Sequence, residues 1–135
     1  MKLISTRHSQ TAFSLATLIL RVVLGMVMLI AHGSDKLRHF SKYSGGFADP
    51  FRIGSAFSLS LDIFAEAFCS CLIVLGLFTR LACIPLIIAM SVALIYAHHG
   101  EAFGAGERAV LFLAGFISLL FLGPGKISVD KLIGN

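Results

Sequence analysis

Four apolar runs, separated by polar or glycine-containing stretches, set the pattern of the chain. They cover residues 12–31, 55–77, 81–97 and 107–123. About 20 apolar residues in a helix cross a hydrocarbon core ~30 Å thick. No run alternates as a membrane strand does, and open strands leave backbone groups unsatisfied in lipid. The pattern predicts an all-α polytopic membrane protein, an antiparallel bundle of four transmembrane helices in a single domain, residues 1–135.

The connections between the runs indicate how the bundle is arranged. Thr79 and Arg80 are the polar residues in the three-residue gap between the second and third runs, which predicts an antiparallel hairpin. The longest connection, about residues 33–54, mixes aromatic and basic residues, so we expect it to lie at the interface over the mouth of the bundle. An even number of spans puts both termini on one side. Basic residues divide evenly between the two ends, and the basic N-terminus then favours cytoplasmic termini.

Composition supports a membrane protein and excludes several other classes. Hydrophobic residues make up 57% of the chain and charged residues 13%, against about 25% charged in soluble domains. The net charge of +4 comes mostly from loops and tails, where basic residues anchor helices to lipid headgroups. No nucleic-acid-binding motif accompanies it, so we expect the lipid bilayer, and no nucleic acid, as a partner.

Two kinds of cofactor find little support. His98-His99-x-Glu101, with His32, is a candidate metal site of mixed nitrogen and oxygen ligands. Adjacent histidines on a helix point about 100° apart, however, and interfacial histidines explain the motif equally well. The chain has no phosphate-binding loop and no G-x-G-x-x-G motif. We therefore expect neither a metal nor a nucleotide cofactor.

Two charged residues lie inside the apolar runs at matching depth. Arg21 is near the middle of the first run and Glu66 near the middle of the second. A cation at the centre of a membrane helix costs about 2.5–3.5 kcal/mol, so Arg21 needs a buried anion or a watery cavity. We expect Arg21 and Glu66 to pair. The pair is either part of a functional site or a structural device that sets helix register, because desolvation can cancel its Coulomb gain.

A second carboxyl favours the functional interpretation. Asp62 precedes Glu66 by one helical turn and shares its face. Two carboxyls exceed what Arg21 neutralises, so we expect one of them to hold a proton at neutral pH. A protonatable carboxyl in a membrane cavity suits proton transfer or a hydrogen bond to a quinone carbonyl. Glu66 and Asp62 are therefore the candidate catalytic residues.

Further polar residues gather at the end of the bundle away from the termini. His32 and Lys36 continue the face of Arg21, and Glu107 opens the fourth run. This arrangement predicts a cup that is polar at one end and apolar at the other. Arg21, His32, Lys36 and Glu107 are the candidate residues for binding a quinone headgroup, with the isoprenoid tail in the apolar half.

An ordered set of short motifs spans about Leu18 to Leu132. The set comprises Leu20-Arg21-Val22-Val23-Leu24-Gly25, His32-Gly33-x-x-Lys36, Glu66, Leu75-Gly76-Leu77-Phe78-Thr79-Arg80, Glu107 and Gly123-Pro124-Gly125-x-x-Ser128-x-Asp130. In this order and spacing the chain resembles the DoxX family of small bacterial membrane proteins. The resemblance implies a four-helix protein of the bacterial cytoplasmic (inner) membrane that is associated with redox enzymes. Some relatives are linked to quinol oxidation or to thiosulfate oxidation with quinone as acceptor, and others to detoxification enzymes.

Three hypotheses follow for function. The leading one is a redox-linked membrane subunit that binds a quinone, and because no redox centre is visible in the sequence its electrons come from a partner or a small donor. The alternative is a membrane scaffold or assembly partner for soluble redox or detoxification enzymes, with no catalysis of its own. A small-solute carrier is the third, although four helices without a duplicated half leave little room for alternating access. A homo-oligomer would relieve that objection.

Overall fold

The computed structural model describes residues 3–134, within which every regular element is helical. Three of the helices continue through π-helical segments, labelled η. The elements are α1 (Gln10–Val27), η1 (Met28–Gly33), α2 (Ser34–Arg38), α3 (Phe40–Tyr43), α4 (Ser55–Ile63), η2 (Phe64–Cys69), α5 (Ser70–Leu75), α6 (Thr79–Val92), η3 (Ala93–Ala97), α7 (Glu107–Leu122) and α8 (Val129–Leu132). The predicted all-α class is confirmed.

Three continuous helical stretches are long and apolar enough to cross a membrane. They are Gln10–Arg38, Ser55–Leu75 and Thr79–Ala97. The first continues past the predicted end at residue 31, so the polar residues that follow the apolar run are still helical. The remaining long helix, α7, has 16 residues and packs along α6 and α1.

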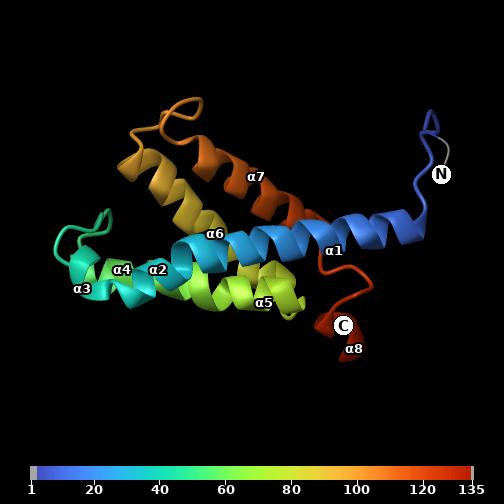
Figure 1. Ribbon diagram of the computed structural model, residues 1–135, viewed down its shortest axis with the longest axis horizontal. Helices are drawn as coiled ribbons and strands as arrows, with labels where there is room; N and C mark the ends of the chain where they lie inside the picture. Colours follow the sequence, from blue (N-terminus) through green and yellow to red (C-terminus); the bar gives the residue numbers. More distant parts are fainter. Residues whose placement is uncertain (1–2, 135) are drawn as a thin grey trace.

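The helices pack as two antiparallel pairs (Figure 1). The stretch from α1 to α2 runs beside α4, η2 and α5, and the α6–α7 pair is inclined to them. Fully buried Met28, Ile73, Leu86 and Phe116 bring these helices together in one core. Gly25 lets α1 approach α5 closely, since a Cβ there would lie 2.6 Å from a methyl group of Val74. Large apolar side chains elsewhere point outward, as those of a lipid-facing surface do.

The π-helical segments of the first two stretches meet each other. A Cβ on Gly33, at the end of η1, would lie 2.5 Å from the carbonyl oxygen of Glu66 in η2, so only glycine permits this approach. π-helical turns are often associated with functional sites. Here the close crossing carries the next turn of the first helix, and with it Lys36, to the level of Asp62 and Glu66.

Arg21 is buried at the other end of the bundle, and its predicted pairing with Glu66 is wrong. Its Nε donates to the carbonyl of Ile73 (2.9 Å) and Nη2 to that of Val74 (3.2 Å). Nη1 donates to the carbonyls of Pro124 and Ile127. The guanidinium thus caps the last turn of α5 and holds the segment after α7, because free carbonyls at a helix end attract a cation.

The C-terminal segment returns to the α5–α6 turn through Asp130. Its carboxylate accepts hydrogen bonds from the backbone N–H groups of Phe78 (2.8 Å) and Thr79 (3.1 Å), at the start of α6. Its own N–H donates to the carbonyl of Gly76 (2.9 Å). A carboxylate suits a helix N-terminus because it satisfies free N–H groups there. Arg21 and Asp130 therefore tie the chain end to the α5–α6 turn.

Candidate functional site

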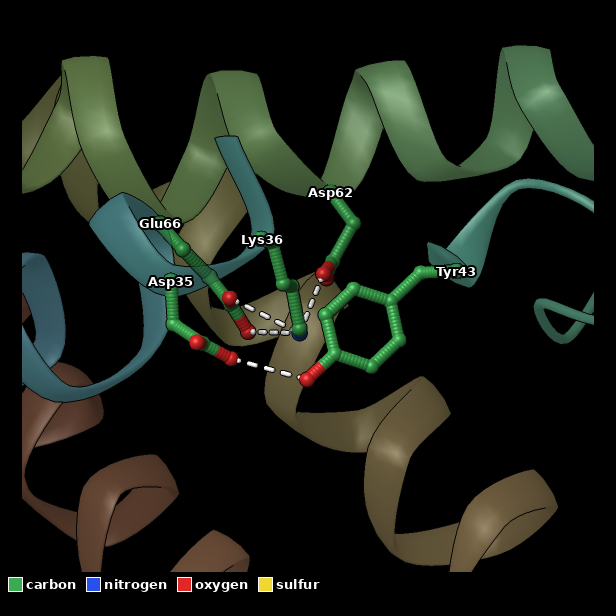
Figure 2. A network of polar contacts seen from close by, with 5 residues as sticks. All are labelled: Asp35, Lys36, Tyr43, Asp62 and Glu66. Atoms are coloured by element: carbon green, nitrogen blue, oxygen red, sulfur yellow. Dashed lines mark hydrogen bonds and ion pairs between the residues drawn. The ribbon is translucent and has the colours of Figure 1, made fainter. Parts of the chain in front are cut away.

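The candidate site centres on an ammonium shared by two carboxylates (Figure 2). Lys36 Nζ donates to Asp62 Oδ2 and to Glu66 Oε1, the latter at 2.9 Å, and lies 2.8 Å from Glu66 Oε2. The side chain of Glu66 is 2% exposed, that of Asp62 13% and that of Lys36 22%. Lys36, Asp62 and Glu66 are called the lysine cluster below.

The lysine cluster contains more acid than base. One ammonium faces two carboxyls, and the two oxygens of the buried Glu66 carboxylate lie 2.9 Å and 2.8 Å from Lys36 Nζ. Asp62 and Glu66 share that one positive charge, so the cluster keeps an uncompensated negative charge in a buried place. The cluster can therefore accept a proton, or a hydrogen bond from a ligand, at Glu66 and keep its ion pair with Lys36.

A second polar contact holds the connection after α2 against the lysine cluster. The helix breaks at His39, and α3 turns back so that the Tyr43 hydroxyl donates to Asp35 Oδ2 at 2.9 Å. This hydrogen bond to a carboxylate raises the pKa of the Tyr43 phenol above its ordinary value, since the carboxylate favours the protonated hydroxyl. The contact places the Tyr43 ring beside the cluster, as the predicted position of the connection over the mouth requires.

The lysine cluster lies in the wall of a cavity of about 810 Å³, called the polar cavity below. Residues of η1, α2, α3, α4, η2, α6, η3, α7 and two connections line it. The candidate site residues among them are His32, Lys36, Asp62, Glu66 and Glu107. Arg21 does not line the polar cavity, since its guanidinium is engaged by backbone carbonyls at the other end.

Sequence reasoning missed the aromatic part of the polar cavity. Both tyrosines of the chain, Tyr43 and Tyr96, line it. Phe112 lines it as well and meets the ring of His32 edge to face, with centroids 5.7 Å apart. The scarcity of tyrosine in an apolar chain was the signal available, because a phenol in a membrane protein is placed where its hydroxyl finds a partner.

The histidine-rich connection does not assemble a metal site in the described part of the chain. Within residues 3–134 no three His, Cys, Asp or Glu side chains are grouped as ligands. His98 lines the polar cavity, whereas Glu101 lies outside its lining. His99 has a φ of 53°, in the left-handed region, so the two adjacent histidines occupy a turn and not a helix.

Comparisons with known proteins agree with this architecture. The DoxX family model matches residues 16–99. The chain is 30% identical over 131 residues to an uncharacterised membrane protein of Mycobacterium tuberculosis, covering 86% of this chain and 80% of that protein. No solved structure matches. Together with the three apolar helical stretches, these similarities identify the chain as a membrane protein.

Proposed function

This chain belongs to the DoxX family, and from that membership we propose that it is a redox-linked membrane subunit that binds a quinone or a similar small lipophilic redox partner. The observation that carries the proposal is the lysine cluster in the wall of the polar cavity. Ligand sites combine a largely apolar wall with a few converging polar groups, and this cavity has that composition.

The residues that line the polar cavity suit both the binding of a quinone headgroup and the proton transfers of its reduction. Reduction to the quinol takes two electrons and two protons. Glu66 and Asp62, which share the single ammonium of Lys36, exchange protons with the headgroup and accept from a quinol hydroxyl. Lys36 keeps the two carboxyls together and donates to a carbonyl oxygen. His32 and Glu107, which also line the cavity, contact the ring. A partner redox enzyme supplies the electrons.

The membrane arrangement is part of the proposal. We place α7 as a fourth span, since 16 residues of helix extend about 24 Å and local bilayer thinning accommodates a short span. Both termini then lie on one side, which we assign to the cytoplasm of a cell whose inner membrane holds the protein. Labelling of a cysteine placed after Ile133 tests this: protection from an impermeant reagent in intact cells is expected, and labelling reverses the orientation.

Arg21 favours the alternative function, a membrane scaffold or assembly partner for redox or detoxification enzymes. Arg21 was one of the predicted headgroup-binding residues, yet it donates to four backbone carbonyls. Part of the polar core is therefore structural, as a scaffold requires. A soluble enzyme that co-purifies in stoichiometric amount, with no lipophilic ligand, would favour this function, with or without assembly of the chain into a homo-oligomer.

Mass spectrometry of lipid extracts tests the leading proposal. Protein purified in mild detergent is compared with Glu66→Gln and with the matched control Glu101→Gln, whose carboxyl lies outside the polar-cavity lining. Stoichiometric quinone is expected in the wild type and in Glu101→Gln, and depleted quinone in folded Glu66→Gln. Equal, trace amounts in all three samples would overturn the proposal.

A further inference from the structure

An apolar groove adjoins the polar cavity on the outer side of the bundle. It lies between α4, η2 and α6, encloses about 300 Å³, and is closed at one end by the connection before α4. Its lining is almost entirely apolar and includes Phe47 and Phe51 of the connection, Leu61 and Phe64 of the α4–η2 wall, and Pro85 and Ile88 of α6. This hollow is called the apolar groove below.

Residue size explains why a hollow forms at this place. The buried side of the apolar groove is made by small residues, among them Ser58, Ala65 and Ala89. Larger side chains, Leu61 and Ile88, stand at its rim and remain about half exposed. Small residues facing one another across two helices leave space that a bulky core would fill. Because the rim is exposed on the apolar surface of a membrane protein, the groove opens towards the lipid.

The apolar groove and the polar cavity adjoin each other along a shared wall. Five residues line both, namely Phe47, Ala48, Asp62, Ala89 and Val92. Asp62 is therefore at the junction, with one side towards the apolar groove and its carboxylate bonded to Lys36. A molecule that occupied both spaces would have a compact polar head and a hydrocarbon chain.

Charge in the polar cavity selects among such molecules. Its lining has three carboxyl residues, Asp62, Glu66 and Glu107, against the permanent cations Lys36 and Arg108. Lys36, the cation beside the junction, is already bonded to Asp62 and Glu66, so an anionic phosphate head would compete with two carboxyls for it, whereas a neutral carbonyl-bearing head would not. This argues against a phospholipid and for an uncharged head.

We propose that the apolar groove holds the isoprenoid tail of a quinone whose headgroup occupies the polar cavity, and that the ligand enters sideways from the bilayer between α4 and α6. The inference rests on the proposed function and differs from the sequence-based expectation, which put the tail in the apolar half near the termini. That half is closely packed around fully buried Ile73, Leu86 and Leu119.

Chain-length dependence of binding tests the proposal. Affinities of the purified protein for a quinone with a long isoprenoid tail and for the same ring without a tail are measured by isothermal titration. The test variant is Leu61→Trp/Ile88→Trp, which narrows the apolar groove from both sides. Ile84→Trp is the matched control, because Ile84 is similarly exposed on α6 but outside the groove lining. Exposed rim positions carry little packing, and retained melting temperature establishes that each variant is folded.

The expected result is about a tenfold weaker affinity of the double variant for the tailed quinone, unchanged affinity for the tail-less ring, and no change in Ile84→Trp. Equal affinity of the double variant and the wild type for the tailed quinone would overturn the tail site and leave the proposed function intact. If the wild type binds neither the tailed quinone nor the tail-less ring, the proposed function fails as well. Stoichiometric phospholipid that is lost only from the double variant would assign the groove to a lipid chain and overturn the proposal.

Discussion

Gly33 and Glu66 meet backbone to backbone at the crossing of η1 and η2. A Cβ on Gly33 would lie 2.5 Å from the Glu66 carbonyl oxygen and 2.8 Å from the N–H nitrogen of Ala67. These are rigid atoms, so a larger residue can be accommodated only if the helices move apart. Because Lys36 follows Gly33 by one turn, the crossing also sets the distance from Lys36 to both carboxyls of the lysine cluster.

Gly33→Ala therefore tests whether this crossing maintains the lysine cluster. We expect a loss of about 1–3 kcal/mol in the free energy of unfolding, as for overpacking elsewhere, together with weaker quinone binding. Gly45→Ala is the control, since a Cβ at Gly45 meets nothing within 4 Å. Thermal unfolding in detergent and ligand titration measure the two effects. Wild-type stability in Gly33→Ala would show that the helices separate without cost.

Lys36 neutralises carboxylates that would otherwise repel each other in a buried place. Lys36→Gln should cost about 2 kcal/mol, less than the 3–5 kcal/mol of a fully buried pair because Lys36 is partly exposed. Adding Glu66→Gln removes the excess charge, so the double variant should recover most of the stability and still fail to bind quinone. Chemical denaturation of the four proteins forms a double-mutant cycle. Strict additivity of the two losses would contradict the shared ion pair.

The outcome for Arg21 and Lys36 indicates what a sequence can and cannot predict here. Long apolar runs predict helices reliably, because lipid leaves no other way to satisfy the backbone. The gathering of His32, Asp62 and Glu107 at one end also follows from helix periodicity. The partners of Arg21 could not be predicted from helix periodicity, because a search for oppositely charged residues overlooks the backbone carbonyls at a helix end. Lys36 was predicted as a headgroup-binding residue, but its ion pairs with Asp62 and Glu66 were not, since the helix continues beyond its apolar run to Arg38.

Arg21 should stabilise the C-terminal segment and should have no effect on quinone binding. Arg21→Gln removes donors from buried carbonyls, so we expect a loss of at least about 2 kcal/mol and faster proteolysis after Leu122. Arg21→Lys should rescue little, because a single ammonium cannot reproduce the fork of guanidinium donors. Arg80→Gln is the control, as the guanidinium of Arg80 makes only an exposed 3.5 Å contact with the carbonyl of Phe121. Limited proteolysis and quinone content per folded molecule separate the roles. Loss of quinone from a stably folded Arg21→Gln variant would show that Arg21 belongs to the ligand site after all.

Asp49 gives the connection before α4 a dependence on pH. Partial burial raises the pKa of Asp49, but hydrogen bonds from the N–H groups of Ile53 and Gly54 and the hydroxyl of Ser58 outweigh it, so the pKa lies below its ordinary 3.8. A lowered folded-state pKa contributes stability that is present above the unfolded value and is lost as pH falls through the folded one. Wild type should therefore melt above Asp49→Asn at pH 6, and the difference should shrink as the pH falls below about 4. Melting curves of both proteins between pH 6 and pH 3 measure this difference, which removes the contribution of other carboxyls. A constant difference over that range would mean that the charge of Asp49 is not what holds the loop.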